Sequence, residues 1–149
     1  MLLEVTNDTP SRALRIEDLS PGDTVAQTVV FDSEKRKAFS ALAHDRAPIH
    51  HRAGFAWEQG FDAPVIQGLA VTTRFSRLIG MYLPGEQAIL QKVEFKYRRP
   101  VYADRELLFS CTVVRVLRPL GVVVLGLSVS LGGVDHVTGL SQCLVLPCR

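Results

Sequence analysis

A carboxylate and an imidazole stand five positions apart in residues 43–50, which read AHDRAPIH. Pro48 costs about 3 kcal/mol inside a helix, so Asp45 and His50 are not expected to share one regular helix. An irregular segment can instead turn both side chains into one cleft. Two groups that exchange protons in opposite senses and hold one water are what reversible hydration of a double bond requires. The alternative is an N-cap aspartate beside a surface histidine, which carries no chemistry.

Gly68 precedes the longest helical pattern of the chain, which runs to about Tyr82 and stops at Pro84-Gly85. The first N–H groups of a helix have no partner within the helix and lie at its positive end. Because glycine has no side chain, a substrate carbonyl can approach the Gly68 N–H, as in an oxyanion hole, where one donor is worth about 3–4 kcal/mol. The alternative is a glycine needed only for close packing of the helix on a sheet.

The segments before Gly68 are predominantly helical, and those after Tyr82 are strand-like. A first strand is predicted at 25–31. A helix is predicted from Asp32 or Ser33 to about Ala43, with Phe39 and Leu42 on its buried face. A second helix at 53–59 is expected to stop at Gly60. Four long segments rich in Val, Leu and Ile follow, at 88–97, 106–117, 121–131 and 136–146. Their short connections favour an antiparallel sheet wrapped around the long helix, an α+β class.

Composition indicates one soluble globular domain over residues 1–149. Apolar residues make up 47% and charged residues 21%, and the net charge is +2. No dense Lys/Arg stripe points to nucleic acid, and no apolar run predicts a signal peptide or a membrane span. Cys111, Cys143 and Cys148 have neither metal-site nor disulfide spacing, so we expect reduced thiols in a cytoplasmic protein.

Several motifs occur in an order that resembles the MaoC-like family of (R)-specific enoyl-CoA hydratases and acyl dehydratases. The resemblance covers about residues 20–146. It rests on FSALAHDRAPIH at 39–50, then Ala56, Gly60-Phe61, PVI at 64–66, Gly68 and Ser76. Downstream, Leu83-Pro84-Gly85 and FKYRRPVY at 95–102 resemble the family's helix exit and its F-R-R-P-V strand.

The resemblance implies a hot-dog fold, usually a homodimer, that acts on acyl thioesters of coenzyme A or acyl carrier protein. It implies reversible addition of water to a trans-2-enoyl thioester, which gives the (R)-3-hydroxyacyl product. Asp45 and His50 match the catalytic pair, Gly68 matches the oxyanion-hole glycine, and Ser76 matches a serine near the acyl pocket. No metal, nicotinamide or flavin is implied, and coenzyme A or phosphopantetheine enters only as part of the substrate.

Four positions depart from the family pattern. His44 replaces a glycine, Ala47 an asparagine, Gln67 a common histidine, and Asp104 a turn glycine. Losing the asparagine removes an amide that can order the loop. A histidine is strained where φ must be positive, so the turn at His44 is expected to be rebuilt. We count Ala47 and Gln67 among the substrate-binding positions and expect a changed substrate preference.

Arginines near strand ends, Arg98 and Arg99 above all, are candidates for binding coenzyme A phosphates or an acidic carrier protein. Otherwise they form a solvated face. His44, Asp45, His50 and His51 also cluster, but no Cys or Glu at ligand spacing completes a metal site, so none is expected. Two other functions remain open. One is a hot-dog thioesterase, and the other is a non-catalytic subunit that binds acyl thioesters.

Overall fold

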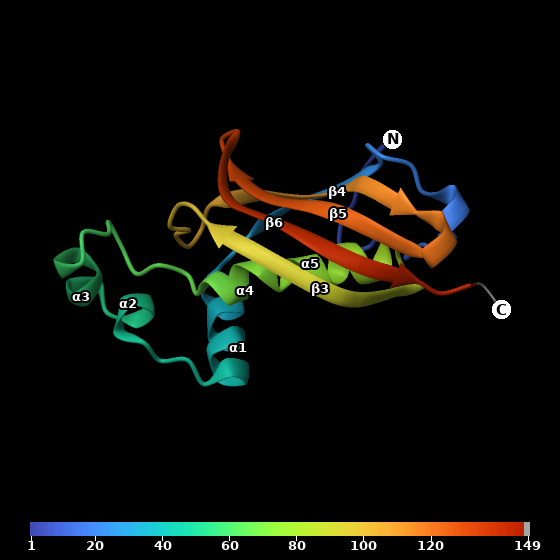
Figure 1. Cartoon of the computed structure of the whole chain (residues 1–149). Helices are drawn as coiled ribbons and strands as arrows, with labels where there is room; N and C mark the ends of the chain where they lie inside the picture. The colour runs from blue at the N-terminus through green and yellow to red at the C-terminus, as the bar shows by residue number, and fades with distance from the viewer. Residues whose placement is uncertain (148–149) are drawn as a thin grey trace.

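Six strands form one sheet in the order β1-β2-β4-β5-β6-β3 in a computed structural model that describes residues 1–147 (Figure 1). Neighbouring strands pair antiparallel except β1, which lies parallel to β2. The sheet was predicted to be antiparallel, and its four long C-terminal strands were expected. The strands are β1 (Leu2–Glu4), β2 (Thr24–Val30), β3 (Ala88–Tyr97), β4 (Glu106–Leu117), β5 (Val122–Leu131) and β6 (Val134–Val145).

The long helix predicted from Gly68 is present as two segments that follow one another directly. Thr73 separates them and itself has helical φ and ψ of −55° and −27°. Its hydroxyl donates to the Ala70 carbonyl at 2.6 Å, which is how a mid-helix threonine competes with the backbone. The helices are α1 (Ser33–Ala43), α2 (Pro48–His51), α3 (Ala53–Glu58), α4 (Gly68–Thr72) and α5 (Arg74–Met81).

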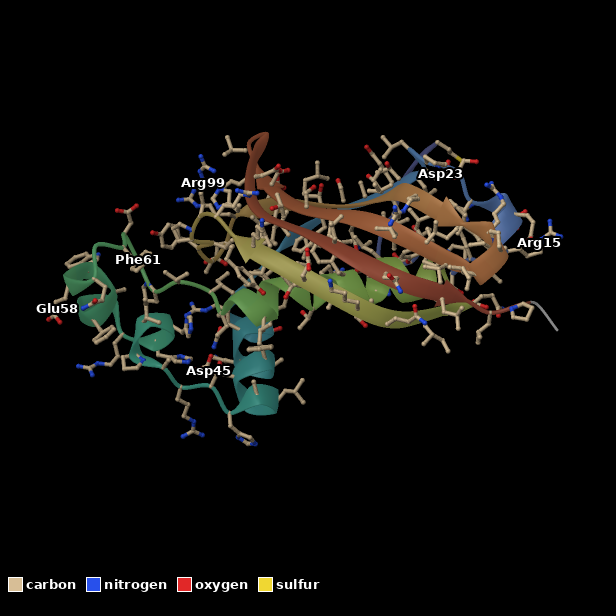
Figure 2. All side chains as sticks on the ribbon, in the orientation of Figure 1. Arg15, Asp23, Asp45, Glu58, Phe61 and Arg99 are labelled. Carbon is tan, nitrogen blue, oxygen red and sulfur yellow. The ribbon has the colours of Figure 1, made fainter. Side chains whose placement is uncertain are left out.

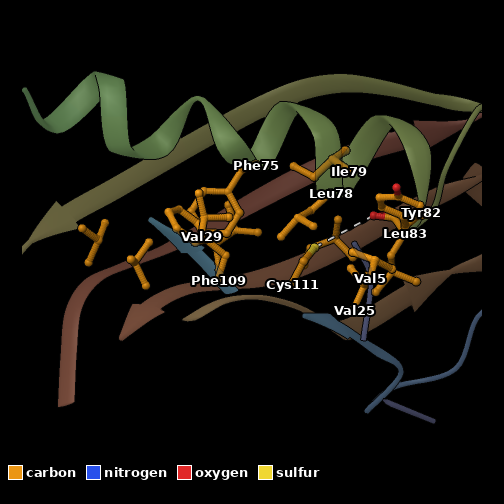
Figure 3. Packing of buried hydrophobic residues seen from close by; sticks show 14 of the residues in the cluster. Val5, Val25, Val29, Phe75, Leu78, Ile79, Tyr82, Leu83, Phe109 and Cys111 are labelled. Atoms are coloured by element: carbon orange, nitrogen blue, oxygen red, sulfur yellow. Dashed lines mark hydrogen bonds between the residues drawn. The ribbon is translucent and has the colours of Figure 1, made fainter. Parts of the chain in front are cut away.

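Helix α5 lies across one face of the sheet and supplies the centre of the core (Figure 3). Phe75, Leu78 and Ile79 are buried on it, and the Phe75 ring lies 5.6 Å from that of Phe109 on β4. Each such side chain contributes roughly 1.5–3 kcal/mol when it leaves water. The core therefore anchors the helix that α4 begins, and with it the position of Gly68.

Helices α2 and α3 project beyond one end of the sheet, whereas α1 lies beside the start of α4 and points away from the sheet (Figure 1). Asp32 caps α1 as predicted, because its Oδ1 accepts from the Lys35 N–H at 2.9 Å. The prediction that Leu42 is buried was wrong, since its side chain is 80% exposed, whereas Phe39 packs partly against the core. Leu42 is on the last turn of α1 and lines an open surface hollow with Phe31 and Ala70, which lie near its side chain but do not cover it.

The other local predictions differ only at segment ends. The strands at 88–97 and 106–117 have the predicted bounds, and Gly60 has the expected positive φ of 85°. The short segments β1 and α2 were not predicted, because three or four residues carry too little periodicity. Within residues 1–147, no helix has the length and apolar character that crossing a bilayer would need.

Candidate active site

Asp45 and His50 lie close together where the chain turns from α1 into α2. His50 Nε2 is 3.8 Å from Asp45 Oδ2, and the two side chains are 18% and 36% exposed. Pro48 begins α2, a position where its missing N–H costs nothing. Asp45 therefore stays in the loop while His50 joins the helix, as the proline predicted. The two atoms are close enough for both to hydrogen-bond one water molecule.

The His50 ring is held in one orientation by a backbone carbonyl. Its Nδ1 lies 2.7 Å from the Val65 oxygen. A carbonyl only accepts, so Nδ1 carries a proton and Nε2 is directed towards Asp45. The Val65 N–H donates back to Ile49 at 3.1 Å, and Arg36 donates to the His50 carbonyl at 2.6 Å. His50 is thus positioned from segments on both sides of its own helix.

The loop between α1 and α2 keeps its turn despite the two replacements. His44 ends α1 in the left-handed region, at φ 54° and ψ 21°, so the expectation of a rebuilt turn was wrong. The Ala47 N–H donates to Asp45 Oδ1 at 3.0 Å, and the His51 ring donates to the Asp45 carbonyl at 3.2 Å. These bonds hold the loop in place of the side-chain amide that an asparagine at position 47 would supply. Asp104 likewise has a positive φ, of 61°.

Gly68 is needed for packing and is also open for binding. A Cβ at this position would lie 2.7 Å from the Tyr97 ring, so no larger residue fits without moving that ring. Its N–H meets no acceptor within residues 1–147. The Tyr97 hydroxyl is 3.3 Å from Thr72 Oγ1, whose own proton is directed to carbonyls of the same helix. Sequence analysis missed Tyr97. The motif FKYRRPVY could have indicated it, because Tyr97 directly precedes Arg98 and Arg99 there.

A cavity of about 560 Å³ at the end of the sheet is lined by both His50 and Gly68, whereas Asp45 is not one of its lining residues and reaches it only through His50. His50, Gly68, Tyr97, Arg98 and Arg99 line it, and its other walls are mainly apolar. Figure 2 shows Asp45, Phe61 and Arg99 at the sheet end from which α2 and α3 project. Hydrogen bonds to β6 orient both arginines. Arg98 donates to Thr138 Oγ1 at 3.0 Å, and Arg99 donates to the Asp135 carbonyl at 3.1 Å. A cavity of mixed cationic and apolar walls suits an acyl group with a charged carrier.

Three predicted substrate-binding residues do not line this cavity. Ser76 is exposed on α5, two turns beyond Gly68. Gln67 is only 3% exposed, and its amide donates to Ser40 Oγ on α1 at 2.9 Å. Ala47 contributes its backbone N–H to Asp45. No three His, Cys, Asp or Glu side chains of residues 1–147 converge as metal ligands would.

Two thiols are buried in the core and take no part in the site. Burial raises the pKa of the Cys143 thiol to about 11, and burial followed by the neighbouring Cys143 raises the pKa of Cys111 further. Both therefore remain protonated at neutral pH and are poor nucleophiles. Cys148 lies outside the described residues.

Similar solved structures include several hydratases. The (R)-hydratase from Aeromonas caviae superposes with a TM-score of 0.82 at 25% identity, over 87% of this chain and 99% of that one. The R-hydratase PhaJ1 from Pseudomonas aeruginosa also gives 0.82, at 21% identity over 95% and 98%. The MaoC-like dehydratase from Rhodospirillum rubrum gives 0.74, at 20% identity over 91% and 99%.

Sequence comparison finds relatives of the same kind. A mitochondrial 3-hydroxyacyl-[acyl-carrier-protein] dehydratase from Arabidopsis thaliana is 36% identical over 90 residues, which is 60% of this chain and 53% of that protein. The (R)-specific enoyl-CoA hydratase from A. caviae is 27% identical over 125 residues, 83% and 92% of the two chains. The chain thus spans about half the length of the Arabidopsis relative. No protein-family model matches the sequence.

The sheet wrapped around α4 and α5 and the similar structures define a hot-dog fold. Within that class, the chain is similar to an (R)-specific enoyl-CoA hydratase and to 3-hydroxyacyl-[acyl-carrier-protein] dehydratases.

Proposed function

We propose that this protein catalyses reversible hydration of a trans-2-enoyl thioester to the (R)-3-hydroxyacyl thioester. The observation that carries the proposal is the Asp45–His50 pair, whose nearest side-chain atoms are 3.8 Å apart and whose histidine lines the same cavity as Gly68. A water on the pair and a thioester carbonyl at Gly68 would place the reacting double bond between them. The relatives named above as hydratases and dehydratases support this reaction class.

In the proposed mechanism, the thioester carbonyl accepts from the Gly68 N–H, which stabilises negative charge as the enolate forms. Asp45 and His50 hold the water. One of them takes its proton while oxygen bonds to the β-carbon, and the other delivers a proton to the α-carbon. Dehydration reverses these steps. Because adding water involves no net oxidation or reduction, the mechanism needs no redox cofactor, and the proposed steps use only side chains and the Gly68 N–H.

The acyl carrier is the second part of the proposal. Arg98 and Arg99 give the cavity two fixed cations at the end of β3, within the wall that Tyr97 begins. Guanidinium groups bind phosphate through paired hydrogen bonds. They therefore suit a thioester of coenzyme A or of a phosphopantetheine-bearing carrier protein. The buried, reduced Cys111 and Cys143 support a reducing compartment, which we propose to be the cytoplasm.

We also propose that the protein acts as a homodimer. Strand β3 is at the edge of the sheet, paired only with β6, and most of its residues are exposed. Apolar side chains such as Ile89, Leu90 and Val93 would remain in water on a single chain. A free strand edge with apolar residues is an aggregation hazard that a second copy can cover.

One assay tests the reaction class. Purified protein is incubated with crotonyl-CoA and with a longer enoyl-CoA, while enoyl absorbance and free thiol are followed together. We expect loss of the enoyl signal without thiol release. Thiol release would identify a thioesterase instead, and no change in either signal with any enoyl carrier would identify a binding subunit.

A further inference from the structure

A second hollow, of about 400 Å³, lies between α1 and the loop that holds Asp45. We call it the basic hollow. Its polar lining consists of Ser33, Arg36, Lys37, Ser40, Arg46 and His51. None of its lining residues is an Asp or a Glu. The neighbouring carboxylate of Asp32 is engaged by Lys35 at 2.6 Å, and Asp45 Oδ1 accepts from Ala47. The hollow therefore carries concentrated positive charge that no carboxylate in its own wall neutralises.

The basic hollow and the site cavity are separate hollows that share the short segment from Asp45 to His51. His50 lines the cavity, while the next residue, His51, lines the hollow. Arg46, which also lines the hollow, directly follows Asp45. His50 and His51, which are adjacent in the chain, thus line two different hollows. A ligand in the hollow would contact the same backbone that positions the proposed catalytic pair.

Two further contacts connect the hollow with the site. Arg36 donates to the His50 carbonyl, and its Nε is buried with no hydrogen-bond partner among the described residues. Ser40 accepts from the Gln67 amide, which leaves the Ser40 hydroxyl proton free to donate. Gln67 directly precedes Gly68. The hollow is therefore bounded by groups bonded to the elements that carry Asp45, His50 and Gly68.

We propose that the basic hollow binds a phosphate group, supplied either by the acyl carrier or as free phosphate. Two guanidinium groups, an ammonium group and serine hydroxyls match the several acceptor oxygens of a tetrahedral phosphate. Naming the carrier as one source rests on the proposed function. A phosphate there draws α1 and the loop together, because its ligands come from both.

The test measures binding rather than turnover. Titration calorimetry of the full chain uses coenzyme A and inorganic phosphate as separate probes, with wild type and the double variant Lys37→Gln/Arg46→Gln. We expect dissociation constants to rise by about tenfold or more, the effect of losing charge-assisted hydrogen bonds. The control variant Arg52→Gln/Arg105→Gln removes two positive charges at residues that do not line the hollow. It should change the dissociation constants by less than about twofold. Lys37→Arg/Arg46→Lys keeps the charge and should keep the binding.

Each outcome has a defined meaning. Weaker binding of coenzyme A identifies the carrier as the source, and weaker binding of inorganic phosphate alone identifies free phosphate. Unchanged binding of both probes, or an equal loss in the control variant, overturns the proposal. If the hollow binds coenzyme A but no enoyl thioester is hydrated, the proposed function fails and the phosphate site stands. If hydration occurs and the variants bind normally, the phosphate site alone fails.

Discussion

At the scale of single residues, the proposed chemistry depends on hydrogen bonds that fix the orientation of the His50 and Asp45 side chains. The Val65 carbonyl fixes the proton of His50 on Nδ1, so Nε2 is the nitrogen available to water. Asp45 uses Oδ1 on the Ala47 N–H, which leaves Oδ2 as the oxygen nearest to His50. Each group thus presents one defined atom to a shared water, the arrangement that proton transfer in two directions needs.

Removing either member of the pair should abolish most of the activity. Asp45→Asn and His50→Ala are each expected to lower turnover of the best enoyl-CoA on the order of 10²–10⁴-fold. Circular dichroism and the melting temperature should remain close to wild type, because both side chains lie at the periphery of the core. Asp62→Asn, an exposed carboxylate nearby, is the matched control. A variant of the pair with near-native kcat would remove that residue from the mechanism.

Substrate preference should respond to position 47. We expect weak activity on crotonyl-CoA and higher kcat/KM on a longer, branched or carrier-bound acyl group, with Ala47→Asn altering that order. The reason is that the loop is held by the Ala47 N–H and the His51 ring instead of an amide. The measurement is kcat/KM across acyl chains for both proteins. Crotonyl-CoA as the best substrate, with no effect of Asn, would show that the replacement is functionally silent.

The turn at His44 stores backbone strain that glycine should release. His44→Gly is expected to raise the free energy of unfolding by up to about 1 kcal/mol, since a non-glycine residue in the left-handed region costs about 1–2 kcal/mol. Ala41→Gly, in the body of α1, should instead lower it by about 1 kcal/mol. Urea unfolding monitored by circular dichroism compares the three proteins. A lower stability of His44→Gly would mean that the histidine side chain makes a compensating interaction.

At the scale of elements, the site depends on the contact between the start of α4 and the end of β3. Tyr97 covers the position where a Gly68 side chain would be, and its hydroxyl bonds Thr72 on the same helix. Gly68 therefore has two possible duties, which are to admit the tyrosine ring and to admit a substrate carbonyl. Both were alternatives from the sequence, and the structure shows the first directly.

A double-variant cycle separates the two duties. Gly68→Ala should lower kcat/KM, because its methyl group meets the Tyr97 ring at 2.7 Å and also crowds the N–H. Tyr97→Ala makes room for that methyl group. If only packing matters, the double variant should regain the kcat of Tyr97→Ala. We expect it to stay lower by about 10²-fold, the cost of a blocked oxyanion donor. Full recovery would remove Gly68 from the proposed oxyanion site.

At the scale of the whole molecule, the β3 edge of the sheet leaves apolar side chains and backbone hydrogen-bonding groups exposed to solvent. Strand β3 presents apolar residues to solvent. Helices α2 and α3 project beyond the end of the sheet, and Trp57 on α3 is 69% exposed. The core under α5 is formed by residues of this chain. The β3 edge and the projecting helices α2 and α3 remain exposed to solvent.

Light scattering should therefore give twice the chain mass of 16.4 kDa at micromolar concentration. Val93→Lys, a charge on the β3 edge, should shift the protein towards monomer, since burying an unpaired charge costs several kcal/mol. Val134→Lys places the same charge at an exposed position on β6, away from that edge, and should leave the mass unchanged. A monodisperse wild-type monomer would contradict the dimer.

Local features of this protein were determined by the sequence alone. The bounds of β3 and β4, the Asp32 cap and the turn at Gly60 follow from propensities and patterns of residues close in the chain. The spacing of Asp45, Pro48 and His50 indicated that the two groups do not share one helix and allowed a bend that brings them together. Such features depend on neighbours within one or two turns, whose energetics do not change with the rest of the fold.

The contacts between these local elements and distant segments were determined only by the tertiary structure. The carbonyl that orients His50, the tyrosine that covers Gly68 and the exposure of Leu42 depend on where distant segments pass. The basic hollow likewise forms only because α1 packs beside the loop of Asp45. No periodicity in the chain encodes these contacts directly, because strand register and the path of the loops across the end of the sheet bring the partners together.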